Sequence, residues 1–198
     1  MKRKIQMVVC SVLALFLFGC KTNSNDPISS SDAVLVAYFS ATGTTESVAE
    51  KISLSIGATL YEIVPMIPYT TEDLNYNNSN SRTNQEQNDP TCRPEINGPL
   101  LDMTEYDVVL IGYPIWWGEA PKIIYTFLES YDFSGKTILP FCTSGSSGIG
   151  MSAQHLASST NGANWREGRR FSGNVTQSVI DDYLKEFGLI PKKEGDNR

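Results

Sequence analysis

The stretch VLVAYFSATGTTESVAEKI, which runs from Val34 to Ile52, joins three patterns that together indicate a fold. Residues 34–40 are almost continuously apolar, as expected for a strand that is buried on both faces. Residues 40–45 are small, and none carries a positive charge. Residues 44–56 then have apolar side chains four positions apart and end before Gly57, which predicts a helix. The sequence therefore predicts a buried strand, a tight loop and a helix in direct succession.

The rest of the chain repeats this alternation of strand and helix. Further strands are predicted at 59–64, 108–114, 137–143 and 165–171, the last of them short, polar and at a sheet edge. Further helices are predicted to start at Pro121, to span 149–157 and to be capped by Asn174. Strands that alternate with helices form parallel βαβ units with right-handed crossovers. The predicted fold class is α/β, a three-layer α/β/α sandwich around a five-stranded parallel sheet.

Residues 66–101 interrupt this rhythm with a polar, Asn-rich insertion that is too long for an ordinary connection. Such a segment is either a functional excursion or a partly disordered loop, and its composition favours neither. Arg82, Glu86 and Arg93 could approach a ligand from it, although a solvated charged surface is the simpler interpretation. The single histidine, His155, is interpreted as a surface or satisfied side chain.

The N-terminus has the pattern of an export signal. A basic start, Met1 to Lys4, precedes an apolar run over 5–18 that is shorter than the roughly 20 residues of a membrane span. The run ends in Leu-Phe-Gly-Cys20, which resembles the lipobox of bacterial lipoproteins and implies acylation of Cys20. The alternatives are an ordinary cleaved signal or an uncleaved anchor, with Cys20 an incidental thiol.

The sequence thus predicts four parts of unequal size. They are a lipoprotein signal peptide at 1–20, a flexible tether at 21–32, one folded domain at 33–191 with its insertion at 66–101, and a polar tail at 192–198. Loss of 1–20 would remove three positive charges and no acids, which takes the net charge of −6 to −9. So acidic a chain has no electrostatic reason to bind nucleic acid, and contact with a membrane would depend on the lipid.

Four cysteines do not predict a metal site. Two of them lie in the export segment, and no C-x-x-C pair or His/Cys cluster with metal-ligand spacing occurs. Cys92 and Cys142 remain, in a polar loop and an apolar strand respectively. Whether they form a disulfide is left open at this point.

The small-residue loop at 40–45 has the composition of a phosphate site. A helix N-terminus presents free N–H groups and the positive end of the helix dipole to an anion. No lysine follows Gly43 as in a Walker A loop, and three spaced glycines of a dinucleotide fingerprint are absent. A phosphatase loop would need a cysteine and an arginine. What remains is a phosphate held by hydroxyls and backbone amides without a cation. The alternative is a generic helix N-cap and turn, in which so many Ser and Thr would be unremarkable.

Two further loops should lie at the same sheet edge. In a doubly wound sheet, a ligand at the carboxyl ends of the strands also meets the loops after the third and fourth strands. Here these loops are YPIWWG at 113–118 and TSGSSGIG at 143–150. Two adjacent tryptophans at the end of a strand cannot both enter the same core, so at least one should lie near a ligand or the surface.

All three loops resemble those of flavodoxins, over nearly the whole of 34–190. The first resembles the S/T-x-T-G-x-T phosphate loop of that family, the second its P-x-W-x-G stretch, and the third is rich in small residues that let backbone approach a flat ring. The resemblance implies a flavodoxin-like sandwich with strand order 2-1-3-4-5 and FMN as cofactor. It implies these cofactor-binding residues: Ser40, Thr42, Gly43, Thr44, Thr45, Pro114, Ile115, Trp116, Trp117, Gly118, Ser144, Gly145, Ser146 and Gly148.

Trp116 matches the tryptophan of the family pattern and is expected to stack on the isoalloxazine ring. Because neighbouring side chains on an extended segment point in opposite directions, Trp117 is expected mainly to support the loop.

The functional expectation that follows is an FMN-dependent redox protein. A flavodoxin-type carrier would pass electrons between partner proteins. The alternative is an NAD(P)H-dependent reductase of quinones or other small molecules, in which 66–101 helps to form a substrate pocket. A flavin-binding module without turnover is a lesser alternative. The leader predicts an exported protein of the bacterial cell envelope, held at a membrane by lipid.

Overall fold

The computed structural model describes residues 28–29 and 32–191. The predicted signal peptide, Cys20, most of the tether and the polar tail lie outside the described residues. One part of the tether does not: Ile28 is buried and packs with the apolar cluster that includes Ile180 and Leu184. The prediction of a free tether up to residue 32 is therefore wrong at Ile28, because this apolar side chain joins the core. Within the described ranges, no helix has both the length and the apolar character needed to cross a bilayer.

A parallel sheet forms the centre of the molecule, in the order β2-β1-β5-β6-β7, with β8 also paired to β6. Its strands are β1 (Val34–Tyr38), β2 (Thr59–Glu62), β5 (Val108–Pro114), β6 (Thr137–Thr143), β7 (Asn164–Trp165) and β8 (Arg169–Phe171). The helices that cover it are α1 (Thr44–Ile56), α3 (Lys122–Glu129), α4 (Ser152–Ala157) and α5 (Gln177–Glu186). The predicted α/β/α sandwich and its strand order are confirmed.

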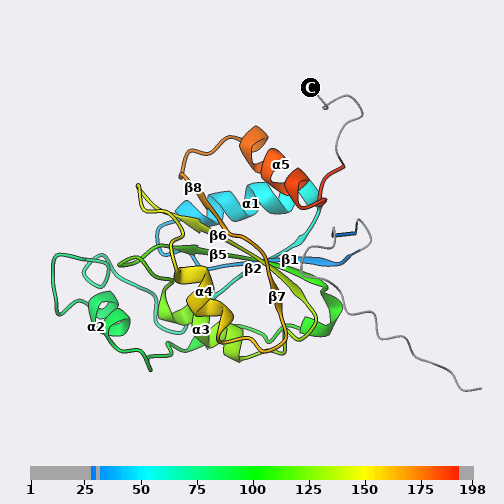
Figure 1. Cartoon of the computed structure of the whole chain (residues 1–198). Helices are drawn as coiled ribbons and strands as arrows, with labels where there is room; N and C mark the ends of the chain where they lie inside the picture. The colour runs from blue at the N-terminus through cyan, green and yellow to red at the C-terminus, as the bar shows by residue number, and fades with distance from the viewer. Residues whose placement is uncertain (1–27, 30–31, 192–198) are drawn as a thin grey trace, which may run out of the picture.

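Both faces of this sheet are buried, which explains why its strands are apolar throughout. Side chains alternate between the faces of a strand. In β5, Val108 and Leu110 join one core cluster while Val109 and Ile111 join the other. Figure 1 shows α1 and α5 over one face and α3 and α4 over the other. The loops that follow β1 and β5 therefore begin next to each other, at the same end of the sheet.

Gly112 in β5 is required by a close approach within the sheet. A Cβ placed on Gly112 would lie 2.2 Å from the ring of Phe141 in the neighbouring strand β6. Phe141 is fully buried, so its ring has no open space to move into. A glycine at this position lets the far end of the Phe141 ring approach the backbone of β5, shortly before the loop that follows Pro114.

Two predicted elements differ from the structure. The edge strand predicted over 165–171 is split into β7 and β8, because Pro140 of β6 has no N–H with which to continue the ladder between them. The last helix begins after Thr176, which takes an extended N-cap conformation, and not at Asn174. Asn174 precedes the helix in a turn closed by the Val175 N–H and the Ser172 carbonyl, 3.0 Å apart.

The insertion has structure of its own. It contains α2 (Arg82–Asn88), a 3-10 turn (Met103–Glu105) directly follows it, and β3 (Val64–Pro65) pairs antiparallel with β4 (Ile96–Asn97). Figure 1 shows α2 standing beside the three layers at the edge of the sheet. The structure therefore shows an ordered segment at 66–101 and not a partly disordered loop.

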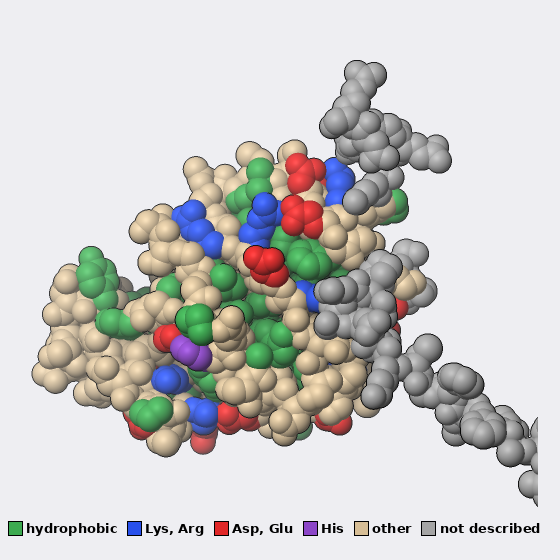
Figure 2. Space-filling view, in the orientation of Figure 1, with side chains coloured by type: hydrophobic (Ala, Val, Ile, Leu, Met, Phe, Trp, Pro, Cys, Tyr) green, Lys and Arg blue, Asp and Glu red, His purple; other side chains and the backbone are tan. Residues whose placement is uncertain are grey.

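The surface carries charges of both signs. On the face shown in Figure 2, acidic and basic side chains are interspersed among uncharged ones. Ion pairs such as Arg169–Glu186 at 3.2 Å and Lys185–Asp182 at 3.0 Å are exposed. Exposed pairs of this kind contribute little to stability.

Candidate functional site

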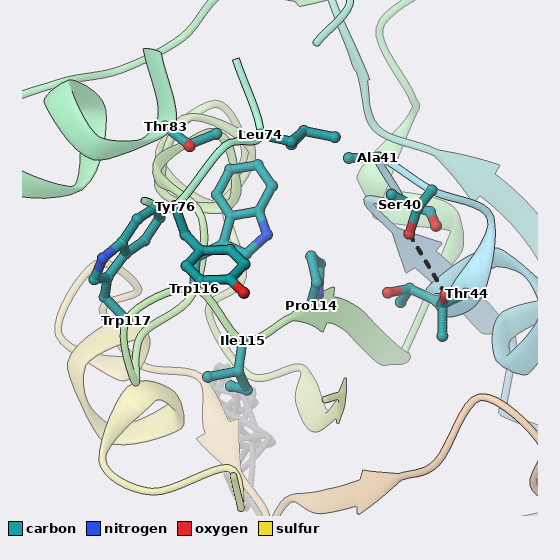
Figure 3. A pocket seen from close by; sticks show the side chains of 12 residues that line it. Ser40, Ala41, Thr44, Leu74, Tyr76, Thr83, Pro114, Ile115, Trp116 and Trp117 are labelled. Carbon is teal, nitrogen blue, oxygen red and sulfur yellow. Dashed lines mark hydrogen bonds between the residues drawn. The ribbon is translucent and has the colours of Figure 1, made fainter. Parts of the chain in front are cut away.

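A cavity of about 410 Å³ opens at the carboxyl ends of β1 and β5, where the sequence placed the ligand. Its lining residues come from the first loop, the loop after β5 and the insertion (Figure 3), and they are Ser40, Ala41, Thr42, Thr44, Thr45, Leu74, Tyr76, Thr83, Pro114, Ile115, Trp116 and Trp117. None of these side chains is charged. The cavity therefore offers hydroxyls and backbone at one end and aromatic surface at the other.

The hydroxyl end of the cavity is formed where β1 leads into α1. Gly43 caps α1 in a left-handed conformation with φ of 79°, which glycine adopts without steric penalty. The first N–H groups of a helix have no partner within the helix and are free for an anion. Ser40 Oγ is buried without a hydrogen-bond partner within the described part of the chain. An orphaned buried hydroxyl is costly unless a ligand completes its bonding, so this end fits a phosphate.

The threonines of this loop have different roles. Thr42 and Thr44 are exposed, and their hydroxyl oxygens lie 3.4 Å apart, at the limit of a hydrogen bond. Thr45 is buried, and its hydroxyl lies 2.8 Å from that of Thr143 at the end of β6. That bond ties α1 to the neighbouring strand end. Thr45 can still offer its backbone N–H to an anion, while its side chain serves the fold.

The two tryptophans lie in a turn and not on an extended segment. The backbones of Trp116 and Glu119 exchange hydrogen bonds of 2.9 and 3.0 Å, and between them Trp117 and Gly118 have φ of 50° and 81°. Positive φ at both central positions defines a type I′ turn, in which asparagine or glycine is favoured. Trp117 is the only non-glycine residue with positive φ among the described residues.

This turn gives the two rings different surroundings. Trp116 packs edge-on against Phe39 and Tyr69, with ring centroids 5.6 and 5.3 Å apart. Trp117 is 47% exposed at the rim of the cavity. The expected extended segment is wrong here, because the turn carries the Trp117 ring away from the core. Stacking of Trp116 on the isoalloxazine stays a prediction. Trp116 supports the loop, and both rings line the cavity.

The third loop lies outside the lining of this cavity. Ser144 is half-buried, and Gly145, Ser146 and Gly148 are exposed. Arg170 of β8 holds this loop in place. Its Nη2 donates to the carbonyls of Ser144 and Gly145 at 2.7 and 2.8 Å. The sequence analysis did not single out Arg170. Because Arg170 lies far from the third loop in sequence, no local sequence pattern indicates that the two are in contact.

The insertion contributes three lining residues that sequence reasoning missed: Leu74, Tyr76 and Thr83. Thr83 is buried, and its hydroxyl donates to the carbonyl of Asp73 at 2.6 Å. Leu74 and Tyr76 were the only signal available, as isolated apolar residues in an Asn-rich segment. Because these residues lie far in sequence from the other loops, the sequence alone did not indicate that they line the same cavity.

The charged residues of the insertion hold it together. Glu86 is buried and accepts a hydrogen bond of 2.7 Å from Arg82 and another of 2.7 Å from the hydroxyl of Tyr69. The guanidinium of Arg82 also lies 4.1 Å from the centre of the Tyr69 ring. Burial, followed by the bond to Glu86, raises the pKa of Tyr69. Arg93 forms a separate bidentate pair with Glu129, with both contacts at 2.8 Å. These side chains organise the structure and do not line the cavity.

The remaining candidates also lie outside the cavity. His155 is exposed and lies 2.9 Å from Glu119. Cys92 and Cys142 are free thiols, and burial raises the pKa of Cys142 to about 12. The described ranges contain no group of acidic, histidine or cysteine side chains that could hold a metal ion.

Comparisons with known proteins agree with this geometry. A structure of a candidate flavoprotein from Bacteroides eggerthii is 47% identical, with a TM-score of 0.74, and the match covers 79% of this chain and 98% of that one. One from Bacteroides uniformis is 42% identical over 78% of this chain and 98% of that chain, with a TM-score of 0.75. A flavoprotein from Lactobacillus acidophilus, solved in complex with FMN, is 25% identical over 79% and 98% of the two chains, with a TM-score of 0.59.

Among curated proteins no match was found. A family model described as Flavodoxin, however, matches residues 33–187, which is most of the chain. The match spans every strand of the parallel sheet and the three loops that follow β1, β5 and β6. The chain therefore belongs to the flavodoxin family.

Proposed function

We propose that the protein binds FMN in this cavity and acts as a flavodoxin-type electron-transfer protein. The observation that carries the proposal is the donor set before α1, where Ser40 Oγ is buried without a partner among the described residues and no cation lines the cavity. Such a set suits a phosphate monoester bound by hydroxyls and amides. The FMN complex of the Lactobacillus acidophilus relative supports the choice of cofactor.

The chain's residues bind and orient this cofactor, and the flavin supplies one- and two-electron redox chemistry when bound. Thr42, Thr44 and the free amides of α1 would hold the phosphate. Trp116 and Trp117 offer aromatic surface to the ring. The net charge of −6 opposes the addition of electrons to the bound flavin. This effect would lower the reduction potential of the flavin.

The hydroxyl loop is tested by comparing FMN with riboflavin, which lacks the phosphate. The wild type should bind FMN far more tightly. Thr42→Val combined with Thr44→Val should weaken FMN binding by about 1.5–3 kcal/mol for each hydroxyl that bonds the charged phosphate, and leave riboflavin unchanged. Thr59→Val, an exposed threonine in β2, serves as the control. Equal wild-type affinities for FMN and riboflavin would contradict a phosphate site.

A second candidate function is an NAD(P)H-dependent FMN reductase of quinones or similar small molecules. The specific observation in its favour is that the insertion lines the cavity through Leu74, Tyr76 and Thr83. Anaerobic reduction of the FMN-loaded protein separates the two functions. Rapid reduction by NAD(P)H with quinone turnover selects the reductase. Slow reduction by NAD(P)H, with two resolved one-electron steps during dithionite titration, selects the carrier.

We also propose that Cys20 carries a lipid that holds the protein at a membrane of the bacterial cell envelope. The proposal is supported by the basic start, the apolar run and the lipobox-like Leu-Phe-Gly-Cys20. Its redox partner would then be another envelope protein or a small acceptor such as a quinone. Labelled palmitate should enter the wild type and not Cys20→Ser, and incorporation into the variant would exclude this residue as the attachment point.

A further inference from the structure

The insertion places an exposed aromatic ring at the apolar end of the cavity. Tyr76 lines the cavity and is 72% exposed. Figure 3 shows its phenol extending from the insertion into the space bounded by Trp116, Ile115 and Pro114. A large aromatic side chain beside a cavity offers surface that a planar ligand can cover.

The backbone of Tyr76 is fixed, although its ring is exposed. Asn84 of α2 is buried, with only 8% of its surface accessible. Its Nδ2 donates to the Tyr76 carbonyl at 3.3 Å, to the Asn78 carbonyl at 2.7 Å and to Ser81 Oγ at 3.2 Å. One buried amide thus sets the path of the chain around Tyr76. A residue whose backbone is held before binding loses less freedom when a ligand covers its side chain.

The same helix also holds the tryptophan side of the cavity. Gln87, one turn after Thr83 on α2, donates from Nε2 to the carbonyls of Trp116 at 3.1 Å and Ala120 at 3.3 Å. Tyr69, which the α2 residues Arg82 and Glu86 contact, packs against the Trp116 ring. Residues of α2 therefore hold the backbone at both Tyr76 and Trp116.

The third loop has no aromatic side chain that could contact a planar ligand in the place of Tyr76. Residues 143–150 contain only Thr, Ser, Gly and Ile. We infer that Tyr76 is a cofactor-binding residue that adds a further aromatic surface to the apolar end of the cavity, beside the tryptophan turn, where the isoalloxazine ring would bind. This inference rests on the proposed FMN binding. It assigns a part of the insertion to the flavin site itself.

Flavin titrations test this assignment. Apo-protein is titrated with FMN and with riboflavin, and the Kd of each is obtained from the quenching of flavin fluorescence. Because Tyr76 would contact the ring and not the phosphate, Tyr76→Ala should raise both Kd values by the same factor, about tenfold on the scale of aromatic stacking. Tyr76→Phe keeps the ring and should bind both flavins like the wild type. Ile67→Ala, an exposed apolar residue of the insertion outside the cavity lining, is the matched control.

The possible outcomes separate the two proposals. Wild-type Kd values in Tyr76→Ala, or a rise for FMN alone, would overturn the role of Tyr76 and leave FMN binding standing. Loss of binding in both Tyr76→Ala and Ile67→Ala would assign the effect to the structure of the insertion, and would also overturn it. Absence of FMN binding by the wild type would overturn the proposed function and this inference together. Urea unfolding of each variant shows that the folded proteins are being compared.

Discussion

At the scale of single residues, Trp117 is the most informative position in the site. A bulky residue with positive φ is strained by about 1–3 kcal/mol, and such strain persists only where the surroundings hold it. Trp117 has φ of 50° and is half exposed beside the cavity. The protein therefore keeps an unfavourable backbone conformation that exposes an aromatic ring at the rim of the cavity. This points to binding as the role of the residue.

Replacing Trp117 should separate stability from binding. Trp117→Asn creates Asn-Gly, the favoured pair for a type I′ turn, and should raise the free energy of unfolding by up to about 1 kcal/mol while weakening FMN binding. Trp116→Ala should instead lower the free energy of unfolding by about 3 kcal/mol, since Trp116 packs against Phe39 and Tyr69. Urea unfolding and FMN titration measure both effects. A Trp117→Asn variant that is less stable but binds FMN normally would be the opposite of this expectation.

At the scale of elements, sequence patterns predicted the regular core well. The strand at 108–114, the strand at 137–143 and the helix at 44–56 have the predicted bounds. These elements are buried on their apolar faces, so periodicity and burial specify them together. The loop at 40–45 was located for a similar reason, because its small residues lie between a buried strand and a periodic helix.

The rest depended on contacts between distant segments. The type I′ turn at Trp117 was missed because tryptophan is not a turn residue, and only the Trp116–Glu119 bridge reveals it. The role of Tyr76 depends on Asn84 and that of the third loop on Arg170, each supplied from another element. Polar residues of this kind carry no periodicity, so their partners appear only in the structure.

Helix α2 provides the prediction that belongs to this scale. Gln87 donates to two carbonyls of the tryptophan loop, and its Oε1 is buried without a partner in the described part of the chain. Gln87→Leu removes one donor from each carbonyl, although the Trp116 carbonyl keeps the Glu119 N–H at 3.0 Å. The substitution should lower the free energy of unfolding by about 1–3 kcal/mol and weaken FMN binding. The loss of the orphaned Oε1 offsets part of this effect.

Gln87→Glu should be worse than Gln87→Leu, since it sets a carboxylate against the same carbonyls. Gln85→Leu, at an exposed position of α2, is the control for helix propensity. The ranking is measured by urea unfolding and by the Kd of FMN. Equal behaviour of the Gln85 and Gln87 variants would show that α2 does not hold the tryptophan loop.

At the scale of the whole molecule, stability should depend on pH through a set of hydrogen-bonded aspartates, four in turns or at helix ends and one, Asp181, within α5. Hydrogen bonds from neighbouring backbone and side-chain donors hold the pKa of each below the ordinary value of 3.8, at Asp73, Asp89, Asp102, Asp132 and Asp181. One residue acts the other way: burial, followed by the charge of Glu46, raises the pKa of Glu62. Five groups thus favour the ionised state in the fold and one disfavours it.

A carboxyl group whose pKa is lowered on folding stabilises the protein above its unfolded pKa, and that stabilisation is lost as pH falls through the lower, folded value. Unfolding then binds protons, so the free energy of unfolding should fall between pH 5 and pH 3, with Glu62 opposing the trend. Urea midpoints at the two pH values measure it. Asp102→Asn keeps an oxygen that can accept from Thr104 but removes the titration, and should reduce the difference between the midpoints. A midpoint that is unchanged or higher at pH 3 would mean that these five aspartates do not control acid stability.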